Sequence, residues 1–225
     1  VNAGGTLAGT GNAINTTVVG SVILGGTGTS LAVLAPGDNT GTLAQQNARM
    51  NLGSSLTINA SGQLQFQLTA PTYQDVDFIA GTTDAAAYLA LNPGKLSDWN
   101  SATPGNHDFV QVAGGLTINA NRADSAFGLG TVQLFLNSYT SPAMGDVFNL
   151  IDWAGALNGS ATFNAGTGFS SGGAHGDFDL PTLTGGLAWD TSAFVSYGVV
   201  VVVPEPGRAL FLLMGVIALA FRRRR

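Results

Sequence analysis

Hydrophobic and polar residues alternate along this chain in short stretches that glycine-rich turns separate. In the first 45 residues, Gly-Thr or Gly-Gly turns are followed by short apolar runs, with examples at Gly5–Leu7, Val18–Leu24, Leu31–Leu34 and Gly41–Leu43. Glycine adopts positive φ values at corners where other residues are strained. Short strands between such corners are typical of the rungs of a β-solenoid.

Two later stretches alternate more regularly. Residues 56–60 (Leu-Thr-Ile-Asn-Ala) and 63–68 (Gln-Leu-Gln-Phe-Gln-Leu) place apolar side chains on one face and polar side chains on the other. This period of two predicts half-buried strands. Residues 116–120 repeat the first stretch letter for letter, and residues 132–136 resemble the second. The same pair of strands is therefore predicted to occur twice.

The rest of the body combines one predicted helix with further strands. Residues 84–91 have a polar start, strong helix formers and a proline–glycine stop after them, which predicts one short helix. Between residues 137 and 203 the strongest predicted strands are Val147–Trp153 and Phe194–Val203. A Gly/Ser/Thr loop from about 155 to 176 separates them. We expect this part to cap the solenoid.

The predicted fold class is all-β. It comprises short parallel β-solenoid or β-helix-like rungs, a β-rich C-terminal cap, and a single C-terminal transmembrane helix. Residues 1–70 are expected to form the glycine-rich rungs, residues 71–203 the continuation and cap, and residues 204–225 a separate tail.

Composition narrows the functional classes. Only 9% of the residues are charged, so amides and hydroxyls must solvate the surface. The net charge is −5, and residues 1–203 hold three basic residues against twelve aspartates, which argues against nucleic-acid binding. The absence of cysteine excludes disulfides and thiolate metal sites. No signal peptide appears at Val1, so we expect a Sec-type signal upstream of the sequence given.

The C-terminal tail has three parts in a fixed order. The motif Pro204, Glu205, Pro206 precedes an apolar run at 209–221, and the basic cluster Arg222, Arg223, Arg224 and Arg225 follows. As a helix the 13-residue run spans roughly 20 Å, less than the ~30 Å hydrocarbon core, and flanking arginines can extend it by snorkelling. The positive-inside rule places the cluster in the cytoplasm. A buried core helix is the alternative, but the run has no polar face.

This ending resembles the PEP-CTERM sorting domain of Gram-negative bacteria that produce exopolysaccharide. The proline–glutamate–proline motif matches its signature, residues 209–221 its helix, and residues 222–225 its basic stop. The resemblance implies recognition by an exosortase-type membrane protease and cleavage near the motif. It also implies passage from the inner membrane to the cell surface or extracellular matrix.

The body resembles the autotransporter-like β-strand-repeat proteins that often carry this tail. The matching stretches are residues 34–43, 145–153 and 186–192. The segment from about Tyr73 to His107 has no obvious counterpart in that family.

Several residue groups suggest chemistry. Gly168–Gly172 fits the G-x-S-x-G pattern, and His175 and Asp177 follow it, but a hydrolase triad needs a strand–turn–helix and partners from distant loops. The pairs Asp75/Asp77 and Asp177/Asp179 have a spacing that suits calcium ligands or polysaccharide-cleaving carboxylates, and also solvated loop and edge residues. Residues 172–177 approach a calcium-binding nonapeptide, in which His175 replaces a required glycine.

Other chemistry has less support. His107 and His175 are the only histidines, which is too few for a zinc site. Trp99, Trp153 and Trp189 could stack on sugars, although core packing is the simpler interpretation. We therefore expect no catalytic, cofactor or metal site.

The predicted function is that of a structural or adhesive surface protein that contacts extracellular polysaccharide. The alternative is a β-helical polysaccharide-active enzyme or a calcium-dependent polysaccharide-binding protein. The three basic residues of the body favour the first hypothesis.

Overall fold

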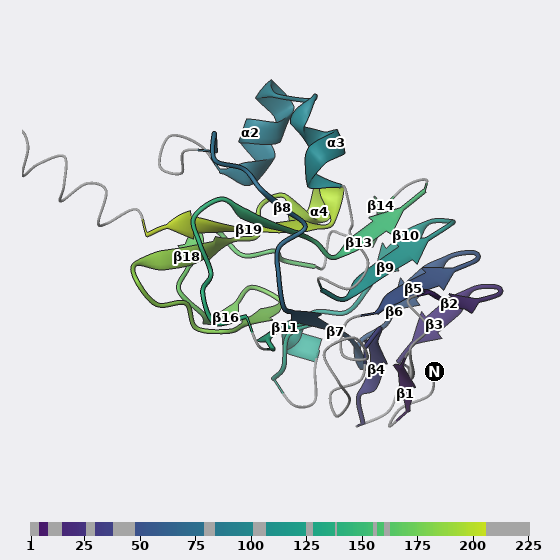
Figure 1. Cartoon of the computed structure of the whole chain (residues 1–225). Coiled ribbons are helices and arrows are strands. Elements are labelled where there is room, and N and C mark those ends of the chain that lie inside the picture. The colour runs from purple at the N-terminus through teal and green to yellow at the C-terminus, as the bar shows by residue number, and fades with distance from the viewer. Residues whose placement is uncertain are drawn as a thin grey trace, which may run out of the picture.

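The computed structural model shows a strand-rich body with few helices, which confirms the predicted β-rich class (Figure 1). It describes residues 5–8, 15–25, 30–37, 48–78, 84–100, 107–124, 128–137, 139–154, 157–159 and 163–205. Among these residues no helix is long and apolar enough to cross a membrane. The predicted transmembrane helix at 209–221 and the arginines that follow it lie outside the described residues.

Three sheets of parallel strands form one half of the body. The first contains β1 (Thr6–Ala8), β4 (Ala32–Ala35), β7 (Gly62–Leu68), β11 (Val132–Leu136) and β17 (Phe178–Leu180), with β16 (Gly173–His175) antiparallel at its end. The second contains β2 (Asn15–Val18), β5 (Arg49–Leu52), β9 (Phe109–Val112) and β13 (Ile151–Trp153). The third contains β3 (Val22–Leu24), β6 (Leu56–Ile58), β10 (Leu116–Ile118) and β14 (Leu157–Asn158).

The chain visits these sheets in the same order on each round, so equivalent strands of successive rounds become neighbours. The repeated sequence shows this directly: Leu56 pairs with Leu116, and Ile58 pairs with Ile118. In the first sheet, Leu64 likewise pairs with Val132. The two predicted copies of the strand pair therefore exist and lie against each other. Each sheet takes strands from both sides of residue 70.

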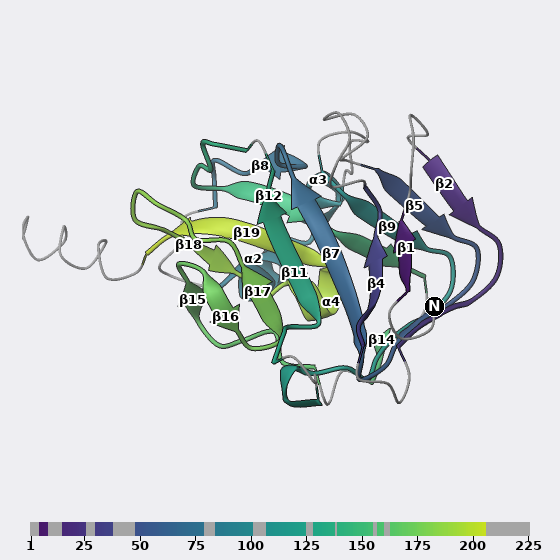
Figure 2. The ribbon, with the colours of Figure 1, turned by 90° about the horizontal axis from the view of Figure 1, so that it is seen from below.

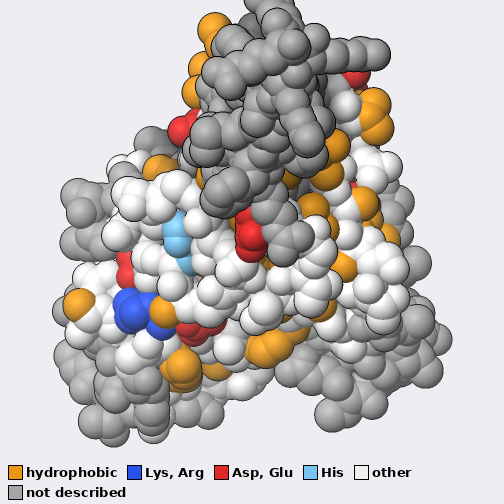
Figure 3. Space-filling model, turned by 90° about the vertical axis from the view of Figure 1, so that its left-hand side faces the viewer, with side chains coloured by type: hydrophobic (Ala, Val, Ile, Leu, Met, Phe, Trp, Pro, Cys, Tyr) orange, Lys and Arg blue, Asp and Glu red, His pale blue; other side chains and the backbone are white. Residues whose placement is uncertain are grey.

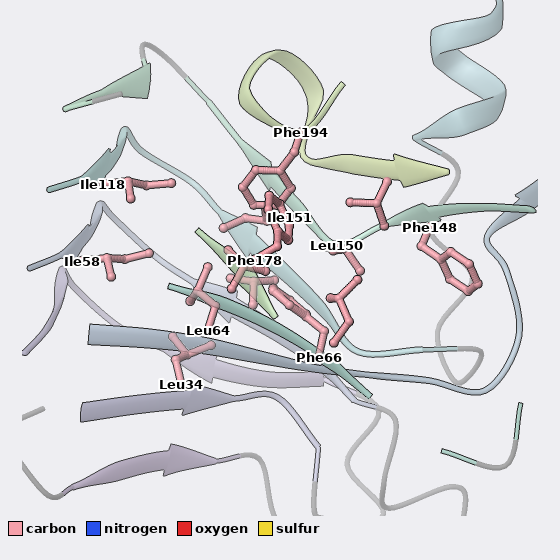
Figure 4. Close-up of a cluster of buried hydrophobic side chains, with 14 of the residues drawn as sticks. Leu34, Ile58, Leu64, Phe66, Ile118, Phe148, Leu150, Ile151, Phe178 and Phe194 are labelled. Carbon is pink, nitrogen blue, oxygen red and sulfur yellow. The ribbon is translucent and has the colours of Figure 1, made fainter. Parts of the chain in front are cut away.

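Side chains that alternate inward from the three sheets fill one hydrophobic core. Leu64, Phe66 and Leu68 of β7 are fully buried, as their alternation predicts. Figure 4 shows Leu34, Ile58 and Ile118 converging with Phe66 and Phe178 inside the body. Ala60 differs from the prediction, because it lies in the turn after β6 and is exposed.

A sheet of antiparallel strands packs beside the parallel part. Its strand order is β15 (Phe169–Ser170), β18 (Leu187–Asp190), β19 (Val199–Pro204), β12 (Asp146–Asn149) and β8 (Tyr73–Gln74). All five valines of β19 are buried. Val200 and Val202 face the main core, while Val199, Val201 and Val203 face a second apolar cluster. A continuous valine run therefore indicates a strand covered on both faces.

Helices cover the outer side of this antiparallel sheet (Figure 1). The predicted helix is α2 (Ala85–Leu91), whose N-terminal Ala87 N–H is capped by the Asp84 carboxylate at 2.8 Å. A second helix, α3 (Lys95–Trp99), follows it, and a 3-10 turn occupies Arg122–Asp124. The five-residue α3 is too short for a sequence period to predict.

The predicted strand at Phe194–Val203 was wrong in its first half, where the chain forms α4 (Phe194–Tyr197). Gly198 ends this helix with a φ of 71°, and a Cβ there would lie 1.7 Å from the carbonyl oxygen of Ile151. Only glycine fits at this approach, and the strand starts after it.

Two other predicted boundaries were wrong. Val147–Trp153 divides at Leu150 into β12 and β13, which belong to different sheets, because Leu150 donates its N–H to Gly198 and accepts from Val110. The predicted loop at 155–176 contains all of β14, β15 and β16. Strands of two or three residues are too short for alternation to reveal.

Candidate functional site

The sorting motif begins where the body ends. Pro204 is the last residue of β19 and pairs with Leu187, while the Glu205 N–H donates to the Gly186 oxygen at 2.9 Å. Because proline cannot donate a ladder hydrogen bond, two prolines in the motif favour an extended and accessible segment. The described part instead remains half-buried and hydrogen-bonded through Glu205. Pro206 and the residues after it lie outside the described residues.

One interpretation of the first acidic pair required Asp75 to be solvated. The residue is instead buried, with 1% exposure. Its Oδ2 accepts the Trp99 Nε1–H at 2.8 Å, and its Oδ1 lies 3.4 Å from the Lys95 Nζ. The Lys95 Nζ also lies 3.0 Å from the Asp77 Oδ2, and the Asp77 side chain is 72% exposed. One lysine therefore bridges a buried and an exposed carboxylate.

This contact secures the two helices against the body. Phe78, Tyr88 and Trp99 form an aromatic group, with ring centroids 4.8 Å apart for Phe78–Tyr88 and 5.6 Å for Phe78–Trp99. The Asp190 carboxylate of β18 accepts the Ala85 N–H at 2.7 Å, at the start of α2. Buried carboxylates here stabilise helix ends and an indole N–H.

The second acidic pair surrounds Arg122. Asp177 is 4% exposed and accepts backbone N–H groups from Arg122 at 2.5 Å and from Asn164 at 2.6 Å. Asp179 binds the Arg122 guanidinium at 2.6 Å and the Gly130 N–H at 2.8 Å. A hollow of about 500 Å³ opens beside Arg122 and Asp177. The polar groups of the pair thus already bind the protein itself.

Arg122 joins three segments, because its guanidinium also donates to carbonyl oxygens of Gly128, Gly176 and Phe178. Replacing it with lysine should lower the free energy of unfolding by about 2 kcal/mol, since an ammonium keeps the charge but cannot reach these acceptors together. Denaturant unfolding measures the loss.

The matched control is Arg49→Lys. Among the described residues, the Arg49 guanidinium donates to the amide oxygens of Asn51 and Gln111 at 3.0 and 3.2 Å and lies 5.1 Å from the centroid of the Phe109 ring, so a loss of about 0.5 kcal/mol is expected. Equal losses for the two variants would contradict the bridging role of Arg122.

The residues of the G-x-S-x-G pattern do not assemble a triad in the described structure. Ser170 lies in the short strand β15 and its hydroxyl bonds the backbone of Gly172 at 3.2 Å. Asp177 accepts hydrogen bonds from Arg122 and Asn164, and the buried His175 Nε2 has no hydrogen-bond partner among the described residues. Burial lowers the pKa of His175. No strand–turn–helix surrounds the serine.

No protein-family model, curated protein or solved structure matches the chain. Its function therefore has to follow from the chemistry of its own residues. Within the described ranges, no group of three or more histidine or acidic side chains could hold a metal ion.

The tryptophans belong to the interior. Trp99 and Trp189 are fully buried, and Trp153 packs against the main core as a partly buried residue. The Trp189 Nε1–H donates to the Pro181 oxygen at 2.8 Å. These rings stabilise the fold rather than present faces to sugars.

Two adjacent buried groups titrate abnormally. His107 is 2% exposed, its Nε2 lies 2.7 Å from the Asn149 oxygen, and burial lowers its pKa to about 4. Asp108 is fully buried and accepts the N–H groups of Ala48 and Gln67, and burial raises its pKa to about 7. Both side chains lie where segments from successive rounds of the chain meet: Asp108 binds Ala48 and Gln67, and His107 binds Asn149.

The outward faces of the parallel sheets carry amide ladders. Gln65 donates to Gln133 of the neighbouring strand at 3.2 Å, and Asn119 donates to Asn59 at 3.2 Å. On the end of the body that carries β16 and β18, the space-filling view shows few red or blue side chains among the white and orange ones (Figure 3). Sequence alternation predicted these polar faces but did not single out Phe135, which interrupts the amides of β11.

Proposed function

We propose that this chain is a secreted or cell-surface structural or adhesive protein of a bacterial extracellular matrix, sorted through its C-terminal PEP signal. The order of motif, apolar run and arginine cluster in residues 204–225 carries the proposal. In this proposal, residues 209–221 hold the chain in the inner membrane until an exosortase-type protease cuts near Glu205.

We also infer that the three parallel sheets form a short β-solenoid, with the antiparallel sheet as its cap. Support comes from the in-register pairing of equivalent strands, for example Met50 with Val110 and Val110 with Ile151. Such stacking sets like side chains beside one another, and here two such pairs are amides. An uncharged, hydroxyl-binding surface suits contact with matrix polysaccharide.

The junction between the body and the tail supports processing at the motif. The Glu205 N–H, directly after β19, donates to the oxygen of Gly186, directly before β18. Cleavage after this point would remove the tail and leave every valine of β19 in its sheet. The mature body would therefore keep its fold.

The alternative functions depend on free carboxylates. Asp75 and Asp177 each accept hydrogen bonds from two or more segments of the protein, and both are almost fully buried. A general acid or a calcium ligand has to face its substrate or ion. These bonds favour the structural proposal.

Processing is the test of this proposal. In an exosortase-containing host, the parent chain should lose its tail and reach the cell surface. Glu205→Gln and deletion of Arg222–Arg225 should each leave an uncut chain in the membrane fraction, as judged by immunoblotting. The glutamine substitution leaves the backbone N–H that bonds Gly186 in place, so the fold is retained.

The matched control is Asp98→Asn, which removes a carboxylate from the exposed surface of α3. It should be processed like the parent. Normal cleavage and surface delivery of both tail variants would contradict the sorting assignment.

A further inference from the structure

The outward face of the first parallel sheet carries one exposed aromatic ring among amides. Figure 2 looks onto this face, with β4, β7 and β11 side by side. On β11 the outward positions are Gln133 and Phe135, which pair laterally with Gln65 and Gln67 of β7. Phe135 is 36% exposed, whereas Val132 and Leu134, which alternate to the inward face of β11, are buried.

A hollow of about 280 Å³ lies at this ring. It is lined by Gln67, Phe135, Leu136 and Asn137. The Asn137 Nδ2–H donates to the Gln67 Oε1 at 2.8 Å, which fixes both amides at the edge of the hollow. Gln67 itself is buried and holds Asn137 in place, so an aromatic face and one oriented amide lie at this concave site.

The lining has the chemistry of a site for an uncharged, hydroxyl-rich ligand. An aromatic ring packs against the C–H face of a sugar ring, while amides both donate to and accept from hydroxyl groups. None of the four lining residues is charged. The Asp108 carboxylate accepts the Gln67 N–H from the protein interior and is fully buried, and the Asp179 carboxylate, opposite Gln133 in the β11–β17 register, is bound by Arg122.

We propose that this hollow is a subsite for one neutral sugar ring of a polysaccharide, with Phe135 as the stacking platform and Asn137 as the orienting amide. This inference rests on the proposed adhesive function and names its ligand class. The row formed by Gln65 and Gln133 continues from the hollow along the sheet and offers hydroxyl contacts to the neighbouring sugars.

Affinity electrophoresis of the full chain in a non-ionic detergent tests the subsite. Native gels would contain a neutral β-glucan, a neutral galactomannan or acidic alginate. At least one neutral polysaccharide should retard the parent chain. Phe135→Ala should weaken that retardation about tenfold, as expected for loss of a stacking platform. Phe135→Trp should retain it, because the larger ring still presents a flat face.

Leu91→Ala is the matched control, since Leu91 is a 78% exposed apolar residue on α2, outside this face. It should migrate like the parent. Circular dichroism would establish that every variant is folded.

Three results would overturn the subsite. Retardation by alginate alone would contradict a neutral ligand. Equal retardation of the parent and Phe135→Ala would place adhesion elsewhere on the surface and leave the proposed function standing. Retardation by none of the polysaccharides would overturn the subsite together with adhesion, whereas sorting is judged separately by cleavage of the tail.

Discussion

Replacing Asp75 with alanine should lower the free energy of unfolding by about 3 kcal/mol. The change leaves the buried Trp99 indole N–H without its acceptor and removes one carboxylate from Lys95. An orphaned buried donor alone costs about 1–3 kcal/mol, and the aromatic contacts around Trp99 loosen with it. Denaturant unfolding followed by tryptophan fluorescence measures the effect.

Asp77→Ala is the control for this prediction, because Asp77 shares Lys95 with Asp75 but is largely exposed. Exposed ion pairs contribute little, so a loss of about 0.5 kcal/mol is expected. Added calcium should leave the free energy of unfolding unchanged in both variants and in the parent. Similar losses at the two positions would contradict the role of Asp75 as the acceptor for Trp99, and stabilisation of the parent by calcium that both variants lose would indicate a calcium site at this pair.

The pH dependence of stability should show two opposed contributions from one corner of the fold. Asp108 keeps a proton in the folded state up to a pKa of about 7, far above its usual range. Raising the pH from about 4 to 7 therefore lowers the free energy of unfolding. His107 stays neutral in the folded state down to a pKa of about 4, so the same rise in pH increases the free energy of unfolding up to about pH 6.5.

Single substitutions should separate these contributions. Relative to the parent, Asp108→Asn should gain about 1.4 kcal/mol of unfolding free energy per pH unit between pH 4.5 and 6. His107→Gln should lose a similar amount of unfolding free energy per pH unit relative to the parent, because the contribution of Asp108 is then unopposed. Glutamine is chosen because its side chain keeps a donor for the Asn149 oxygen. Between pH 4.5 and 6 each difference therefore reaches about 2 kcal/mol.

Urea unfolding at several pH values measures these slopes. Comparison with the parent cancels the other titrating groups, including Asp152 and Asp190, whose pKa values burial also raises. Parallel pH profiles for the parent and both variants would show that neither group has a shifted pKa in the folded protein.

Local sequence patterns predicted those strands whose neighbours in the sheet carry the same or a similar sequence. Residues 56–60 and 116–120 carry the same five letters, and parallel pairing places Leu56 beside Leu116. Identical residues stack because each round of the chain presents the same alternation to the next. The helix after Asp84 was also predictable, since its cap lies within the same few residues.

Contacts between distant segments could not be predicted in this way. Alternation predicts exposed glutamines on β7, yet Gln63 and Gln67 are 1% and 2% exposed because other segments cover them. The partner of Asp190 is the start of α2, 105 residues away in the sequence. The same limit hid the burial of Asp75, whose partner Trp99 lies on a helix that the sequence did not predict.

The mass of the protein recovered from the cell surface tests the central claim most directly. If the tail is a sorting signal, intact-mass spectrometry should find chains that end near Pro204–Pro206 and lack residues 209–225. The membrane fraction of cells without the protease should contain the uncut chain. Surface protein that retains Arg225 would contradict the account.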